Sequence, residues 1–333
     1  GVLTILSAPG KSAAIPSAAA VGNTTGLRLA FAQWLTSPDH PLTARVIVNR
    51  LWQHHFGQGI VATPGNFGAT GSRPTHPALL DWLAVEFMQQ GWSAQRFHKM
   101  MMTSPVYRQQ SERMRIAVRG VENEDIAIPH SKLHTPHSID ADNRLLWRMN
   151  LRRLDAESLR DSVIAVSGQA DYTMGGPPVT LKALPSGLQT VAAEERRSIY
   201  LVARRTNPLT FLRVFDYPII DVNCARRSAS ATPLQSLTMI NSKFLTASAS
   251  QLALRVKALA GDDAPSAKKI ETAYQLTLSR NPSQTEIKAA EEYLQHLTKL
   301  YAASNIEPTN ASKRSFENFV HMLLCSNEFL YVD

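Results

Sequence analysis

Apolar residues recur at helical spacing in the first third of the chain. From Leu42 to Phe56, one arc of a helix is apolar and the opposite arc is polar. The apolar arc holds Ala44, Ile47, Val48, Leu51, Trp52 and His55, and the polar arc holds Arg45, Asn49, Arg50, Gln53 and His54. Similar patterns predict helices from Leu27 to Leu35, between Pro77 and Gly91, and from Ser93 to Met102. Together these elements predict a helical lobe.

A loop rich in glycine and proline follows the 42–56 helix. Residues 57–77 read GQGIVATPGNFGATGSRPTHP, with single apolar residues between the glycines and prolines. This composition is typical of an ordered loop with special backbone angles. Such loops are costly to order and often carry function, so we expect this one to line a site.

The middle of the chain changes pattern twice. Over 111–142 the helical periodicity fades, which predicts a surface insertion or a connection. Asp142 or Asn143 is then expected to cap a long helix to Val166, with Arg144, Arg148 and Arg152 in one row. The runs 179–184 and 198–203 have β-like patterns and predict a small hairpin or sheet.

The last third is predicted to be helical. One long helix is expected from Thr232-Pro233 to about Leu259, and another from the segment 263–265 through Leu278. Ser283 and Glu286 form a capping box for a third helix, and Ser312 is expected to cap the last, which ends near Phe329. The fold class is therefore mainly α, with helical lobes and a small β hairpin or sheet in the middle. The expected segments are a linker (1–26), an N-terminal helical lobe with the glycine-rich loop (27–110), an insertion or connection (111–142), a long helix with the β element (143–231) and a C-terminal helical bundle (232–333).

Arginine dominates the positive charge of the chain. The net charge of +8 comes from 24 arginines and 11 lysines against 27 acidic residues. Arginine favours planar anionic partners, which are carboxylates inside the fold or, outside it, phosphates, sulfated polysaccharide or an acidic protein face. The arginines occur in scattered pairs without interleaved aromatic residues, so no nucleic-acid partner is expected. No apolar run reaches the roughly 18 residues of a membrane span, so none is expected.

Candidate ligand-binding residues gather around the 42–56 helix and its loop. They are Arg45, Asn49, Arg50, His54, His76 and Arg108. Arg50 and His54 share one helix edge beside the loop and are the first choices for an anion, although a structural hydrogen bond to a loop carbonyl is the favoured role of His54. His55 lies next to His54 on the helix, so the two cannot hold one metal at the usual spacing, and His55 is expected to be a hydrogen-bonded core residue.

Metal and catalytic sets are less well supported. His130, His134 and His137 have spacing that suits metal ligands, but the flanking prolines favour an ordinary polar loop, so no metal site is assigned. Asp155, Glu157 and Asp161 are expected to be neutralised at helical spacing by Arg152, Arg153 and Arg160, the pattern of a salt-bridged helix. The two cysteines, Cys224 and Cys325, could form a disulfide or remain buried free thiols.

Several strings in the chain resemble a planctomycete PSD-type domain of unknown function. They include HPLTARVIVNRLWQHHFGQGIVATPGNFGATGSRPTHP, LLWRMNLRRLDAESLRDSVIAVSG, RRSIYLVARR, FDYP, ATPLQSLTMINSKF and SNEFLYVD, in the family's order, over roughly 27–333. The resemblance implies the C-terminal domain of an exported protein, periplasmic or at the cell surface, with a cytochrome c-type domain upstream as its partner. No signal peptide is expected in this chain, and haem c is implied only for the upstream domain, since Cys-x-x-Cys-His is absent here.

Two classes of function stay open. The first is a non-catalytic binding or scaffolding module that presents an arginine-lined cleft to an acidic or sulfated polysaccharide or to a partner domain. The second is a polysaccharide-acting enzyme, hydrolytic or coupled to haem redox chemistry, with a pocket around Arg50, His54 and His76. A shared open cleft would favour the enzyme, whereas internal salt bridges would favour scaffolding.

Overall fold

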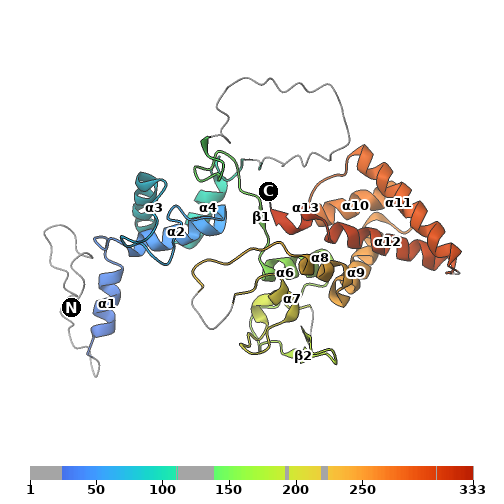
Figure 1. The fold of residues 1–333 in the computed structure, drawn as a ribbon, viewed down its shortest axis with the longest axis horizontal. Coiled ribbons are helices and arrows are strands. Elements are labelled where there is room, and N and C mark those ends of the chain that lie inside the picture. Colours follow the sequence, from blue (N-terminus) through green and yellow to red (C-terminus); the bar gives the residue numbers. More distant parts are fainter. Residues whose placement is uncertain are drawn as a thin grey trace, which may run out of the picture. The chain divides into compact units, whose positions relative to one another are not determined.

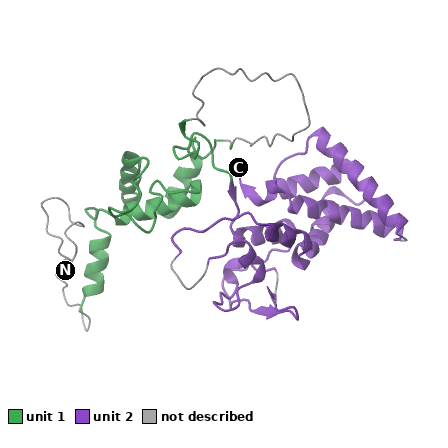
Figure 2. Cartoon of the chain, viewed as in Figure 1, with its two compact units in different colours: residues 1–151, 333 green, residues 152–332 purple. Residues whose placement is uncertain are grey.

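The chain divides into two compact units, each with its own core. The structure is a computed structural model that describes residues 25–109, 111, 139–191, 195–218, 224–304 and 306–332. Unit 1 comprises residues 1–151 with residue 333, and unit 2 comprises residues 152–332 (Figure 2). The described elements are helices and two small antiparallel sheets, which confirms the mainly α fold class. No described helix combines the length and apolar content that crossing a membrane requires.

Unit 1 contains the helices expected from the sequence. They are α1 (Leu27–Leu35), α2 (Thr43–Phe56), α3 (Pro77–Gln89) and α4 (Ala94–Thr103) (Figure 1). The ring Nδ1 of His40 accepts hydrogen bonds from the N–H groups of Leu42 and Thr43 at the start of α2, and burial lowers the pKa of His40. Pro77 occupies the first turn of α3, and Ser93 Oγ caps α4 by accepting from the N–H of Arg96 at 3.3 Å.

The core of unit 1 draws on the glycine-rich loop as well as on helices. Its buried residues are Val48, Trp52, Phe56, Ile60, Val61, Leu80, Leu83, Phe87, Phe97, Met101 and Met149. Ile60 and Val61 come from the loop and are only 2% exposed. The loop is therefore anchored in the core rather than draped over it.

The long helix expected from Asp142 or Asn143 to Val166 is wrong over its first half. The Asp140 carboxylate accepts hydrogen bonds from the N–H groups of Arg144 and Leu145, and Asn143 has a left-handed backbone with φ of 51°. The Asp140 carboxylate thus provides these backbone N–H groups with hydrogen-bond acceptors in a non-helical conformation. The helix α6 spans Ala156–Val166 only, so the arginine row does not form on one helix face.

Unit 2 holds two short antiparallel sheets. Strand β1 (Arg152–Arg153) pairs with β4 (Tyr331–Val332), and β2 (Leu181–Ala183) pairs with β3 (Gln189–Val191). A small hairpin is present, but its second strand is Gln189–Val191 rather than the expected run 198–203, which meets the first run only in an isolated bridge between Val179 and Leu201. The segment Ser198–Tyr200 is a 3-10 helix, η2, because the Ser198 N–H donates to Asp161 and the Tyr200 N–H donates back to Arg197.

The remaining elements of unit 2 are helices. They are α7 (Thr210–Val214), α8 (Pro233–Asn241), α9 (Lys243–Ala260), α10 (Ser266–Leu278), α11 (Gln284–Ala303), α12 (Pro308–Leu324) and α13 (Asn327–Leu330). The capping box of Ser283 and Glu286 is confirmed at the start of α11. Three expectations are wrong. Ser242 has extended backbone and separates α8 from α9, and α12 begins at Pro308 rather than after Ser312. It also ends at Leu324 rather than near Phe329, which lies in the separate helix α13.

The core of unit 2 is built around α9 and α12, which pack against each other. Fully buried side chains on these two helices include Leu252 and Val256 from α9 and Phe319 and Leu324 from α12. Helix α11 packs along α12, and α10 packs against α9. The four helices α9 to α12 therefore form one assembly, drawn in orange and red in Figure 1.

Candidate functional site

Asn49, predicted to lie on the polar side of α2, is completely buried. Its side-chain N–H donates to the Val61 carbonyl at 3.0 Å, and its Oδ1 accepts from the Val61 N–H at 2.8 Å. A Cβ at Gly59 would lie 2.7 Å from Asn49 Nδ2, so only glycine fits beside this pair. The placement of Asn49 on the solvent side is thus wrong, because its amide replaces the missing partners of a buried loop backbone.

Two other candidate residues also make contacts within unit 1. Arg45 pairs with Asp81 of α3, with Nε and Oδ1 2.6 Å apart, and donates to the Pro41 carbonyl. His76 Nδ1 lies 2.9 Å from the Thr75 hydroxyl, and the Thr75 N–H donates to the Ile60 carbonyl. The first pair joins α2 to α3, and the contacts of Thr75 and His76 fix the end of the loop before α3.

A small cavity lies beside the glycine-rich loop. The cavity beside it has a volume of about 20 Å³, and His76 and Trp52 lie in its wall. Arg50, His54 and Arg108 are exposed. Among the described residues, the lining of this cavity brings His76 together with Asn143 and Arg144, and includes neither Arg50 nor His54.

The histidines of unit 1 have separate roles. His55 Nε2 and His98 Nδ1 are 2.8 Å apart and share a hydrogen bond, as expected for His55, but its ring is half-buried rather than in the core. His130, His134 and His137 lie outside the described residues. Within the described ranges, no three His, Cys, Asp or Glu side chains are grouped so that they could hold a metal ion.

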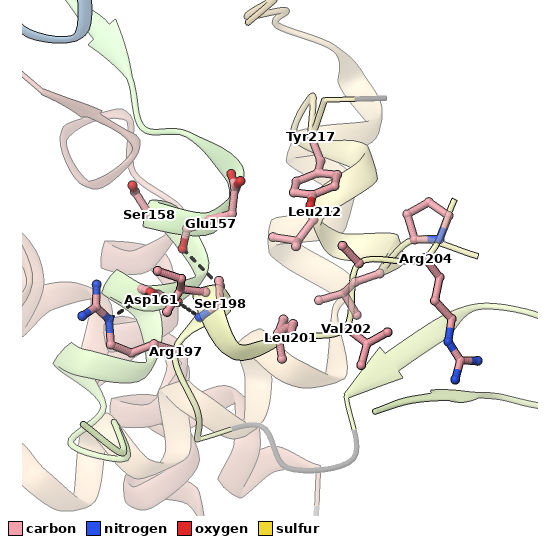
Figure 3. Close-up of a pocket in the computed structure, with 14 residues that line it drawn as sticks. Glu157, Ser158, Asp161, Arg197, Ser198, Leu201, Val202, Arg204, Leu212 and Tyr217 are labelled. Carbon is pink, nitrogen blue, oxygen red and sulfur yellow. Dashed lines mark hydrogen bonds and ion pairs between the residues drawn. The ribbon is translucent and has the colours of Figure 1, made fainter. Parts of the chain in front are cut away.

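A cavity of about 350 Å³ lies beside α6 in unit 2 (Figure 3). Glu157 and Asp161 of α6 form one wall, and Leu212 and Tyr217 face them from the other side. Arg227 binds both oxygens of Glu157 at 2.6 and 2.9 Å, and this hydrogen bonding raises the pKa of Arg227. Glu157 is thus engaged by Arg227.

Asp161, the second of these carboxylates, is held in the same way. It accepts the Ser198 N–H at 2.7 Å and lies 3.5 Å from the Arg197 guanidinium, as the dashed lines in Figure 3 show. Arg160 Nη1 lies 3.7 Å from Asp161. The acidic residues of α6 are therefore salt-bridged as expected, but mainly by Arg197 and Arg227 from later in the chain. Of the arginines expected at helical spacing, Arg160 lies near Asp161, whereas Arg153 pairs with Asp216.

Arg153 of unit 2 links several segments of the fold through hydrogen bonds and an ion pair. Arg153 donates to the carbonyls of Phe215 and Ser230 and pairs with Asp216 at 2.9 Å. Burial alone would raise the pKa of Asp216, but hydrogen bonds from Ser230 and Arg153 hold it below its usual range. Arginine is suited to this role because its planar fork binds several oxygens at once.

Arg280 links three segments at the end of α10. It binds both oxygens of Glu286 at 2.9 and 2.7 Å, and it also pairs with Glu328 of α13. The Arg280 hydrogen bonds lower the pKa of Glu286 to about 2, against the opposing effect of burial and with help from Ser283. This cluster joins the starts of α11 and α13 to the end of α10.

Lysine, by contrast, gathers around a groove on the helices α9 to α12. The groove has a volume of about 880 Å³. Each of the four helices contributes one lysine to its lining: Lys257 from α9, Lys269 from α10, Lys299 from α11 and Lys313 from α12. Glu317 is the single acidic residue of this lining. We call its four lysines the rim and its apolar residues, Ala253, Leu254, Leu294 and Phe316, the floor. We call this feature the lysine groove.

Sequence reasoning missed the lysine groove because its members lie far apart along the chain. A signal was nevertheless present. Seven of the eleven lysines fall between residues 243 and 313, whereas the arginines concentrate earlier. The spacing along single helices gives no sign that four helices bring one lysine each to a common rim.

Both cysteines are free thiols. Cys224 is exposed, and Cys325 is half-buried. Burial raises the pKa of Cys325 to about 11, so this thiol stays protonated at neutral pH. Of the two alternatives, the structure therefore shows free thiols rather than a disulfide, with Cys224 exposed instead of buried.

Comparison with known proteins gives a family and no characterised relative. No curated protein and no solved structure matches the chain. A family model, PSD1, described as a protein of unknown function (DUF1553), matches residues 27–294. Since this match spans most of the chain and includes helices of both units, the protein belongs to the PSD1 (DUF1553) family.

Proposed function

We propose that this chain is a non-catalytic binding module that holds an acidic ligand in the lysine groove. The observation that carries the proposal is the set of four lysines around a groove of about 880 Å³ whose lining has one acidic residue. Sulfated polysaccharide and the acidic face of a partner domain both have the charge that this rim attracts. The volume lies in the range of ligand sites between packed helices.

The contacts of the groove lysines leave them available to a ligand. Lys257 pairs with Asp262 at 3.3 Å, but the two side chains are 54% and 75% exposed. Lys313 and Glu317 are 3.9 Å apart, and Lys269 donates to the Asp262 carbonyl. Exposed ion pairs of this kind contribute little stability, so a polyanion can replace them at small cost.

Contacts at the α6 cavity favour binding over hydrolysis. A hydrolase that uses paired carboxylates needs them available to substrate and water. Glu157 is held by Arg227, and Asp161 is held by Ser198 and Arg197. The resemblance to exported proteins adds the proposal that the module works outside the cytoplasm beside a cytochrome c-type domain.

Retention on a dextran sulfate column tests the proposal. The variant K299Q/K313Q removes two lysines from the rim of the groove. The control K243Q/K288Q removes two exposed lysines from α9 and α11 that lie outside the groove lining. Both variants lose the same net charge, so a difference between them reports position rather than total charge.

We expect the groove variant to elute at clearly lower salt than the unmodified chain, and the control to elute close to it. Because all four positions are exposed, the melting temperatures should remain within a few degrees of the unmodified chain. Equal shifts for the two variants, or no shift for the groove variant, would overturn the lysine groove as the binding site.

A further inference from the structure

We infer that the occupant of the lysine groove is an acidic amphipathic helix of a partner protein. This inference rests on the proposed function and narrows its ligand class. It starts from the floor of the groove, since the rim alone would suit any polyanion.

The floor of the groove is apolar and partly open to solvent. Leu254 of α9 is 50% exposed, and Leu294 of α11 and Phe316 of α12 are half-buried beside it. Covering such surface is favourable only when the ligand brings apolar groups of its own. A sulfated polysaccharide carries charges and hydroxyl groups along its length and leaves this surface uncovered. A ligand with one apolar and one acidic side matches both floor and rim.

The dimensions of the groove suit a helix. Its lining on α12 runs from Thr309 to Glu317, which corresponds to about 12 Å, or roughly two turns of an α-helix. A helix placed between packed helices buries an apolar stripe and leaves its flanks at the rim. In this groove the flanks would meet lysines from four helices, so acidic residues on both sides of the stripe complete the match.

Synthetic peptides test the inference on the full chain. The probe is a fluorescent peptide of about 16 residues built from Leu, Glu and Ala, with leucines at helical spacing along one face. The control peptide has the same composition in an order that scatters the leucines. We expect the amphipathic peptide to bind at least about tenfold more tightly than the scrambled one by fluorescence anisotropy, because only it presents a continuous apolar stripe.

Variants of the floor separate this inference from the proposed function. L254Q changes an exposed floor residue, and L259Q changes an exposed leucine on the same helix outside the groove lining. We expect L254Q to weaken the amphipathic peptide by about fivefold to tenfold and L259Q to leave it unchanged. Retention on dextran sulfate should stay the same in both variants, since neither alters a lysine.

The outcomes distinguish the two proposals. If the two peptides bind with equal affinity while retention on dextran sulfate still depends on the groove lysines, the inference of a helical ligand is wrong. Polysaccharide would then be favoured as the ligand of the same groove. If both peptides bind weakly and K299Q/K313Q does not change retention on dextran sulfate, the lysine groove is not the binding site. Stronger binding of the amphipathic peptide that is lost in L254Q and in K299Q/K313Q supports both.

Discussion

Asn49 is a polar residue in the core of unit 1, and both polar atoms of its side-chain amide form hydrogen bonds with the backbone of Val61. Its two hydrogen bonds to Val61 join the glycine-rich loop to α2. The close approach at Gly59 shows how little space separates loop and helix. At this scale, the first part of the glycine-rich loop, around Ile60 and Val61, is a packed structural element.

Removal of the Asn49 amide should destabilise unit 1 strongly. Asn49→Ala leaves the N–H and carbonyl of Val61 buried without partners, and each such loss costs about 1–3 kcal/mol, so we expect roughly 3 kcal/mol. Urea denaturation followed by tryptophan fluorescence measures this change. The control Arg50→Ala, at the next and exposed position of α2, should change stability by less than about 0.5 kcal/mol. Similar losses for both variants would contradict the role of Asn49.

At the scale of elements, several helix starts were predicted correctly from signals next to them in the sequence, although the expected cap at Ser312 was wrong. Pro77, Ser93 and the pair Ser283 and Glu286 all mark helix starts in the structure. The failures depend on partners distant in sequence or on competing side chains. Asp161 fixes η2 where a strand was expected, and Asp140 satisfies the backbone where a long helix was expected.

The candidate site was harder to predict for a related reason. The residues proposed from one helix and its loop, including Arg50 and His54, are neighbours in sequence. The lysine groove is assembled from Lys257, Lys299 and other residues that only tertiary packing brings together. No periodicity within a single helix contains that information.

The Arg280 cluster predicts an acid-sensitive element in unit 2. The pKa of Glu286 is about 2 in the folded chain, below its ordinary value of 4.5. As the pH falls, the unfolded chain therefore binds this proton first, and the stabilisation present above pH 4.5 is lost between pH 4.5 and about 2. Glu286→Gln should lower stability at pH 7 and flatten this acid dependence, as measured by thermal melts with circular dichroism. Glu292→Gln, an exposed position on the same helix, should keep the dependence of the unmodified chain.

At the scale of the whole molecule, the unfolding of unit 1 can be measured separately by tryptophan fluorescence. All five tryptophans lie in unit 1, at positions 34, 52, 82, 92 and 147. Unit 2 contains the lysine groove, a core of its own, and the pairing of β1 with β4 that joins its two ends. These features give it what an independent domain needs.

Residues 152–332 should therefore fold without unit 1. We expect this fragment to show a cooperative thermal transition by circular dichroism and to keep the retention of the full chain on dextran sulfate, because each described residue of the groove lies within it. The fragment K299Q/K313Q serves as the control for retention. A gradual melt without a transition would show that unit 2 depends on unit 1.

The supply of one lysine by each of four helices has a consequence beyond recognition. The unfolded chain scatters these charges over more than fifty positions, so a molecule that engages all of them binds the native assembly selectively. Such a molecule holds α9 to α12 together. It raises the free energy of unfolding by about 1.4 kcal/mol for each tenfold excess of its concentration over its dissociation constant. The resistance of unit 2 to heat and to proteolysis would then increase with the concentration of the ligand bound in the lysine groove.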